Sequence, residues 1–153
     1  MIYTDNTKKA MKIMARQHKD QLDKSGLPYI LHPWLVAEWQ NDEVRTIVAL
    51  LHDVVEDTDM TFEDIKKEGF SDEVIEALKL LTHDSKDDYD EYLKNIANND
   101  IAIDVKLADL KHNSTISRLD NVEQKDIDRY NKYLRGIEYL ESKRLENKKR
   151  TTR

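Results

Sequence analysis

The chemically densest stretch of the sequence runs from residue 50 to residue 58 and reads LLHDVVEDT. It places the imidazole of His52 and the carboxylates of Asp53, Glu56 and Asp57 within six residues. Because apolar residues surround His52 and Asp53, we expect both to be at least partly buried. An isolated buried charge is costly, so this pair predicts either an ion pair or a metal site. The preceding apolar residues recur at spacings of three and four, which predicts a helix with one face in the core: Val44, Ile47, Val48 and Leu51.

Two residues elsewhere could take part in the same chemistry. His32 precedes Pro33 at the expected start of a helix, where a histidine is also compatible with a simple packing role. Asp109 falls in the middle of an apolar helix expected at 101–116. It could be the partner of a buried lysine or a helix cap, or it could be a metal ligand, and this stretch alone favours neither.

Mixed imidazole and carboxylate ligands suit a divalent metal that assists hydrolysis. Without cysteine, such a site fits Mn²⁺, Fe²⁺, Zn²⁺ or Co²⁺ about equally. A bound metal would polarise a phosphoryl oxygen and lower the pKa of a water molecule. Four residues could supply such ligands from three helices: His32, His52, Asp53 and Asp109.

Glu56 and Asp57 follow one helical turn after the central pair and could face the same cavity. Either carboxylate could orient or deprotonate the attacking water. We expect them at the C-terminal end of the helix, where acids oppose the helix dipole, and this unfavourable placement favours a functional role.

Other catalytic classes lack their sequence motifs. The sequence contains no cysteine and no G-x-S-x-G motif, so it shows no signature of covalent acyl chemistry. The sequence also contains no phosphate-binding glycine loop.

The composition indicates one all-α domain. The chain has 153 residues with only three Gly and two Pro, and no cysteine, which excludes a disulfide framework. The start of the chain does not resemble a signal peptide, and no apolar run is long enough for a membrane span. We therefore expect a cytoplasmic protein without a membrane partner.

The charge is distributed unevenly along the chain. The net charge is −6, but residues 143–153 carry six Lys or Arg and one Glu, which leaves the preceding body near −11. We do not expect such a body to bind nucleic acid. The basic tail could be a nucleic-acid arm, but a solvated helix end is the favoured interpretation. We place the domain at 1–142 and the basic tail at 143–153, and a homo-oligomer is compatible with the sequence.

Periodicity and breakers predict a compact bundle of seven or eight helices. The segment 101–107 alternates as a strand would, but 101–116 contains no Gly or Pro and is long enough to favour a helix. The polar connection 83–88 contains one His and several Asp and could bind a metal, although an ordinary loop is favoured. The helices are expected at about 6–23, 33–40, 42–55, 61–69, 71–81, 88–98, 101–116 and from 127 to about 140.

Three sequence blocks together resemble the HD superfamily of metal-dependent phosphohydrolases. They are KSGLPYILHP at 24–33, LHDVVEDT at 51–58 and VKLADLKHN at 105–113. More narrowly, the chain resembles the hydrolase domain of RelA/SpoT-type enzymes and the small alarmone hydrolases of the metazoan type. The bare His-Asp pair is a weak signal, whereas H-D-x-x-E-D-T with both flanking blocks is specific.

The resemblance implies an all-α HD domain that removes the 3′-pyrophosphate of (p)ppGpp, the alarmone of the stringent response, giving GDP or GTP and pyrophosphate. It implies one divalent metal, Mn²⁺, and a nucleotide as the small-molecule partner. Glu56 and Asp57 would place and activate the water. The metal ligands would be His32, His52, Asp53 and Asp109, and the substrate contacts Lys24, Ser25, Asn113 and Tyr130.

Some positions depart from the family pattern. Asp23 stands where a basic residue usually precedes Lys24, and an acid there would repel a polyphosphate. Leu110-Lys111 replaces the usual Arg-Leu order, and Thr115-Ile116 replaces an Arg-Thr pair. Because these positions lie on the nucleotide side, two alternatives stay open. One is an HD phosphohydrolase that acts on another nucleotide, such as a nucleoside monophosphate or NADPH, and the other is a non-catalytic nucleotide-sensing module.

Overall fold

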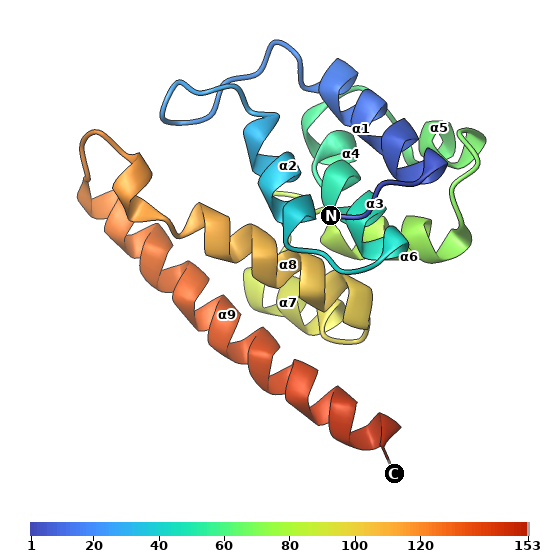
Figure 1. The fold of residues 1–153 in the computed structure, drawn as a ribbon. Coiled ribbons are helices and arrows are strands. Elements are labelled where there is room, and N and C mark those ends of the chain that lie inside the picture. The colour runs from blue at the N-terminus through green and yellow to red at the C-terminus, as the bar shows by residue number, and fades with distance from the viewer. Residues whose placement is uncertain (153) are drawn as a thin grey trace.

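The computed structural model describes residues 1–152, and this part of the chain is almost entirely helical (Figure 1). The expected all-α class is confirmed. No helix within these residues combines the length and the apolar character that crossing a membrane requires. The elements are α1 (Asp5–Gln17), α2 (Leu31–Glu38), α3 (Glu43–Leu51), α4 (Val54–Asp57), α5 (Phe62–Lys67), α6 (Asp72–Leu81), α7 (Tyr89–Ile96), α8 (Asp100–Asn113), the short 3-10 helix η1 (Ile116–Arg118) and α9 (Gln124–Thr151).

Short polar side chains fix the beginnings of most helices. At these positions a side-chain oxygen accepts a hydrogen bond from a backbone N–H of the first turn, which would otherwise have no partner. Such caps set where α3 and α8, the two helices that carry most of the site, begin. The capping residues are Thr4, Asp42, Thr61, Ser71, Asp88 and Asn99.

Helix α3 is the centre of the bundle. All residues from Thr46 to Leu51 are buried, and the helix packs against α1, α2, α6 and α8. Helix α8 is also buried over most of its surface, with Asp109 among its buried residues, as the sequence predicted. The end of α3 and the middle of α8 therefore meet inside the protein.

Helix α9 crosses α8 along one side of the bundle, and its C-terminal part extends past the other helices (Figure 1). Gly136 allows this close approach, because a Cβ atom there would lie 3.1 Å from the hydroxyl of Tyr89 and 3.3 Å from Cδ1 of Leu110. A glycine inside a helix costs about 1 kcal/mol relative to alanine, and here it allows α9 to pack tightly against the bundle.

The structure differs from the sequence-based elements in three places. The segment expected as one helix at 42–55 is two helices, because α3 ends at Leu51 and α4 begins at Val54, so nine α-helical segments occur within residues 1–152. The first helix ends at Gln17 rather than near 23, and residues 18–30 form a loop. Helix α9 continues through residue 142 to Thr151, and Arg153 of the basic tail lies outside the described residues.

Candidate active site and metal centre

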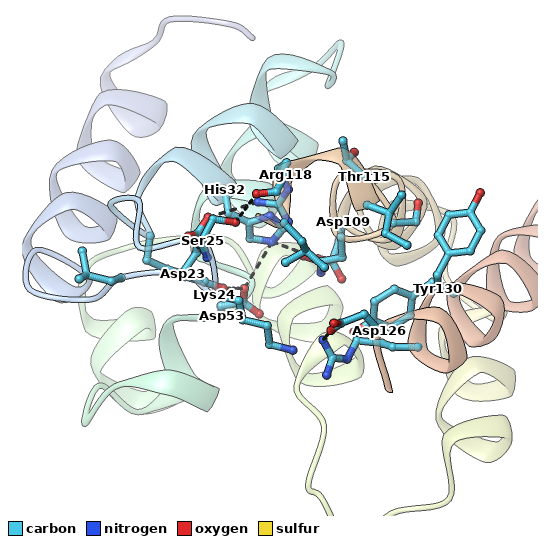
Figure 2. Close-up of a pocket in the computed structure, with 18 of the residues that line it drawn as sticks. Asp23, Lys24, Ser25, His32, Asp53, Asp109, Thr115, Arg118, Asp126 and Tyr130 are labelled. Carbon is cyan, nitrogen blue, oxygen red and sulfur yellow. Dashed lines mark hydrogen bonds and ion pairs between the residues drawn. The ribbon is translucent and has the colours of Figure 1, made fainter. Parts of the chain in front are cut away.

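The four predicted metal ligands come together where α2, the α3–α4 junction and α8 meet. Figure 2 shows three of them, His32, Asp53 and Asp109. Nε2 of His32 lies 3.0 Å from Oδ1 of Asp109 and 3.7 Å from Oδ2 of Asp53. Nε2 of His52 lies 3.0 Å from Oδ2 of Asp53 and 3.7 Å from Oδ1 of Asp109. His32, His52 and Asp109 are buried, and the side chain of Asp53 is 18% exposed.

The interruption between α3 and α4 places two of these groups. His52 is the C-cap of α3 and Asp53 is the N-cap of α4, both with right-handed helical backbone angles. Consecutive residues of an uninterrupted helix point in directions about 100° apart. The break lets His52 and Asp53, although adjacent in sequence, direct their side chains at the same point.

The hydrogen bonds of the two histidines, made through Nδ1, leave Nε2 of each ring facing the two aspartates. Nδ1 of His52 donates to the carbonyl of Ala49 at 2.6 Å, so Nε2 is the ring nitrogen that can face an ion, and this buried atom has no hydrogen-bond partner of its own. Burial disfavours the charged ring, but the carboxylates of Asp53 and Asp109 outweigh it and raise the pKa of His52, so an ion bound here replaces a proton. Nδ1 of His32 lies 2.6 Å from Nδ1 of His112. Burial and the neighbouring charges of His32 and Arg118 lower the pKa of His112 to about 4, so its neutral ring can accept this bond. Such second contacts fix the orientation of metal-binding imidazoles.

The donor set fits a divalent ion. Two ligand atoms that each lie about 2.1 Å from one ion are about 3.0 Å apart at right angles and about 3.4 Å apart in a tetrahedron. The separations of 3.0 and 3.7 Å between these nitrogen and oxygen atoms are close to those values. The partnerless Nε2 of His52 points to the same conclusion, because a metal ion would satisfy it. The buried group of His32, His52 and Asp109 could therefore hold a metal ion, and Asp53 lies beside it.

A buried lysine balances part of the negative charge. Nζ of Lys106 lies 2.7 Å from Oδ2 of Asp109, and both side chains are largely shielded from solvent. Burial alone would raise the pKa of Asp109, but Lys106 and the two histidines outweigh it and hold this pKa well below its usual value. In the same way, His52 outweighs burial and lowers the pKa of Asp53 to about 2. Both carboxyl groups are therefore ionised and available as ligands at neutral pH.

We call the side chains of His32, His52, Asp53 and Asp109 the metal cluster, after the ion they could hold. Glu56 and Asp57 lie beside it, on the one-turn helix α4 rather than at the end of a long helix as expected. A carboxylate oxygen from each lies within 4.8 Å of one from Asp53. Oε1 of Glu56 accepts a hydrogen bond of 2.6 Å from the backbone N–H of His83. Burial, followed by smaller contributions from neighbouring groups, raises the pKa of both Glu56 and Asp57. A carboxylate with a raised pKa, held next to a metal site, is suited to accept a proton from water.

The connection 83–88 has the character of a loop and a helix cap. Asp84 accepts from the backbone N–H of Lys86, and Asp88 caps α7. The groups of ligand atoms close enough to hold an ion, within the described part of the chain, belong to the cluster beside α4 and α8.

A cavity of about 570 Å³, which we call the main cavity, opens onto the metal cluster (Figure 2). Its walls come from the loop after α1, from the segment after α8 and from the start of α9. All four predicted substrate contacts line it: Lys24, Ser25, Asn113 and Tyr130.

Two of these four side chains are already held by the protein. The hydroxyl of Ser25 donates to the carbonyl of Arg118 at 2.9 Å, which fixes the loop that carries Lys24. Nδ2 of Asn113 donates to Oδ1 of Asp109 at 2.7 Å, so Asn113 holds the carboxylate of Asp109 in place. Lys24 makes no ion pair among residues 1–152, and its pKa is lowered by burial and by Arg129. It is therefore free to bind an anion.

Asp23 is neutralised rather than repulsive. One of its oxygens accepts hydrogen bonds from the backbone N–H groups of Ser25 and Leu27, at 2.8 and 3.0 Å. The other lies 3.3 Å from a guanidinium nitrogen of Arg118, 95 residues away in sequence. Asp23 therefore shapes the loop that carries Lys24, and Arg118 compensates its charge, so this departure from the family pattern does not oppose an anionic ligand.

Sequence reasoning missed several groups of the site. The hydroxyl of Tyr29 donates to Oδ2 of Asp53, and Tyr133 and Arg129 of α9 line the main cavity. The apolar spacing of α9 predicted a helix but could not show which of its faces lies over the metal cluster. Lys106 lies three residues before Asp109, the spacing of neighbours on one helix face, so the sequence did contain a signal for that pair.

Comparisons with known proteins point to the same kind of domain. No family model matches the chain. A curated relative from Borreliella burgdorferi, named guanosine-3′,5′-bis(diphosphate) 3′-pyrophosphohydrolase, is 42% identical over 78 residues, which are 48% of this chain and 12% of the relative. A probable enzyme of the same name from Synechocystis is 37% identical over 131 residues, which are 75% of this chain and 17% of the relative.

A solved structure extends the likeness over the whole fold. A metazoan ortholog of SpoT, described as hydrolysing ppGpp, matches with a TM-score of 0.75 and 26% identity over 95% of both chains. The chain is an HD-type domain of the (p)ppGpp hydrolase family. The chain spans only 12 and 17% of the length of the two curated relatives. In this HD-type domain, the cluster of two histidines and two aspartates lies where α3 breaks.

Proposed function

We propose that this HD-type domain hydrolyses the 3′-pyrophosphate of (p)ppGpp with one bound Mn²⁺, giving GDP or GTP and pyrophosphate. The observation that carries the proposal is the convergence of His32, His52, Asp53 and Asp109 beside the main cavity, with Lys24 and Arg129 in its walls. The names of the relatives support the choice of substrate. Carboxylate ligands support Mn²⁺ among the metals that the donor set fits.

The four ligands would hold the ion, which would polarise a phosphoryl oxygen and make a bound water more acidic. Glu56 or Asp57 would accept a proton from the attacking water, since both carboxylates lie beside Asp53 and have a raised pKa. The water oxygen bonds to the phosphorus attached to the ribose O3′, and the bond between that phosphorus and O3′ breaks. The electron pair of this bond stays on O3′, which takes up a proton, so GDP or GTP and pyrophosphate result.

The remaining residues of the main cavity bind and orient the nucleotide. Lys24, which is free of carboxylate partners, faces the cavity together with Arg129, and these cations attract the phosphates. Tyr130 and Tyr133 add aromatic surface from α9. Tyr29 and Asn113 hold Asp53 and Asp109, respectively, so that the ligands are oriented before the substrate arrives.

Product analysis tests this proposal. The purified protein is incubated with ppGpp and Mn²⁺, and released pyrophosphate and orthophosphate are separated by anion-exchange chromatography. We expect pyrophosphate and GDP in equal amounts, and neither product from Asp53→Ala. Orthophosphate, or activity only on nucleotides such as NADPH or nucleoside monophosphates, would reassign the substrate. Tight nucleotide binding without turnover would support a sensing module instead.

A further inference from the structure

A second, smaller cavity of about 170 Å³ lies on another side of the metal cluster, and we call it the side cavity. Part of its wall is shared with the main cavity, so the two cavities meet at the metal site. The shared residues are Asp53, Glu56, Lys106, Asp109 and Tyr133. The remaining wall comes from α7, α9 and the connection before α7. A group bound at the metal site therefore has two directions in which it can extend.

The side cavity has two cationic groups in its wall, Lys132, which does not line the main cavity, and Lys106, which lines both. Lys132 of α9 lines it and makes no ion pair within residues 1–152. Its Nζ lies 4.0 Å from the ring centroid of Tyr89, which holds the ammonium group at the cavity wall. Lys106 lines the same cavity, and its single ionic partner in this part of the chain is Asp109.

A buried hydroxyl in the same wall also lacks a partner. The hydroxyl of Tyr92 donates to the carbonyl of Leu81 at 2.7 Å, whereas the buried hydroxyl of Tyr89, which packs against Gly136, has no hydrogen-bond partner. Buried polar groups in native proteins are rarely left unpaired. The unpaired Lys132, whose ammonium group the Tyr89 ring holds at the cavity wall, points to a ligand with acceptor oxygens.

Charge and size narrow the identity of this ligand. Of the acids in the wall, Asp53 and Asp109 belong to the metal site, so a divalent ion would compensate their charge, and Glu56 is the acid that remains. With Asp53 and Asp109 compensated, the two lysines outnumber the remaining acid, so the wall of the side cavity carries a net positive charge. The volume is well below the roughly 300 Å³ at which pockets for drug-sized ligands begin, so a nucleoside does not fit, whereas one phosphate group does.

We propose that the side cavity binds the distal phosphate of the substrate's 3′-pyrophosphate, with Lys132 and Lys106 as its cationic contacts. This inference rests on the proposed function. The nucleoside and the 5′-phosphates lie in the main cavity, the phosphorus attached to O3′ lies at the metal site, and the second phosphorus of that group extends into the side cavity. The site thereby selects a 3′-pyrophosphate over a 3′-monophosphate, which leaves the side cavity without a ligand.

The test measures binding rather than turnover. Isothermal titration calorimetry with the Mn²⁺-loaded protein compares inorganic pyrophosphate with inorganic phosphate for the wild type, Lys132→Ala and Lys132→Arg. Removing one charged contact should weaken pyrophosphate binding about tenfold or more and leave phosphate binding nearly unchanged. Lys132→Arg should restore most of the loss. Lys143→Ala is the matched control, because it removes an equal charge from the same helix outside the side cavity.

Two results would overturn the proposal. One is an equal effect of Lys132→Ala on both anions, which would indicate only a general loss of positive charge. The other is pyrophosphate binding no tighter than phosphate binding in the wild type. Failure of the proposed function is a separate outcome: a protein that does not hydrolyse ppGpp but loses pyrophosphate binding selectively in Lys132→Ala still has the subsite. A protein that releases pyrophosphate from ppGpp, but whose Lys132→Ala variant shows no selective loss of pyrophosphate binding, has the hydrolase activity without this subsite.

Discussion

Replacing Lys106 by methionine should destabilise the metal-free protein more than the metal-loaded protein. The side chains of Lys106 and Asp109 are only 15% and 6% exposed, and Nζ and Oδ2 are 2.7 Å apart. Removing one partner of a buried ion pair costs about 3–5 kcal/mol, because the remaining charge stays buried without compensation. Asp109 keeps its contacts with His32 and Asn113, so we expect the lower end, about 3 kcal/mol.

In a domain of this size 1 kcal/mol corresponds to about 2–4 °C in Tm, so Lys106→Met should lower the Tm by roughly 6–12 °C. Thermal unfolding followed by circular dichroism in the presence of a chelator measures this change. In saturating Mn²⁺ the loss should be clearly smaller, because the ion itself then compensates the charge of Asp109.

An exposed lysine with the same sequence spacing provides the control. Lys94 pairs with Glu91 three residues away at 3.4 Å, but both side chains are more than 60% exposed. Lys94→Met should therefore cost at most about 0.5 kcal/mol. The reasoning fails if Lys106→Met loses no more stability than Lys94→Met, or if its loss is the same with and without metal.

Three further predictions concern the metal and the water. His52→Ala should abolish Mn²⁺ binding and activity together, because it removes one of four converging ligands; calorimetry and product release measured on the same sample check this. Glu56→Gln should keep Mn²⁺ bound but lower kcat about 100-fold or more, as loss of an acid–base group does, and loss of the metal would show instead that Glu56 is a ligand. Because burial raises the pKa of Glu56 above 4.5 and the base acts when deprotonated, activity in a kcat–pH profile should fall with decreasing pH at a value above 4.5. This acidic limb should change in Glu56→Gln, and an unchanged limb would assign it to another group.

Local sequence carried enough information to predict most of the elements and to select the residues that converge as candidate metal ligands. The apolar spacing before His52 predicted the central helix, and the absence of Gly and Pro from 101–116 predicted the buried helix that carries Asp109. Both signals depend on the period of a single helix, which is a property of neighbouring residues. The sequence did not predict the interruption at His52 and Asp53, because no Gly or Pro marks it.

Contacts between segments far apart in the chain could not be predicted from the sequence. The sequence predicted that the charge of Asp23 would repel a polyphosphate. Only the structure shows that Arg118, 95 residues away, compensates this charge. The hydrogen bond between His32 and His112 spans 80 residues, and its existence depends on how α2 packs against α8.

The sequence by itself determined the helical class and the residues that can hold a metal, because residue type and local spacing fix both. The tertiary structure decided the surroundings of those residues: which charges are compensated, which face of α9 lines the site, and that a side cavity with Lys132 opens beside the metal cluster. These features arise where helices far apart in the chain pack together, so the sequence pattern within one segment does not predict them.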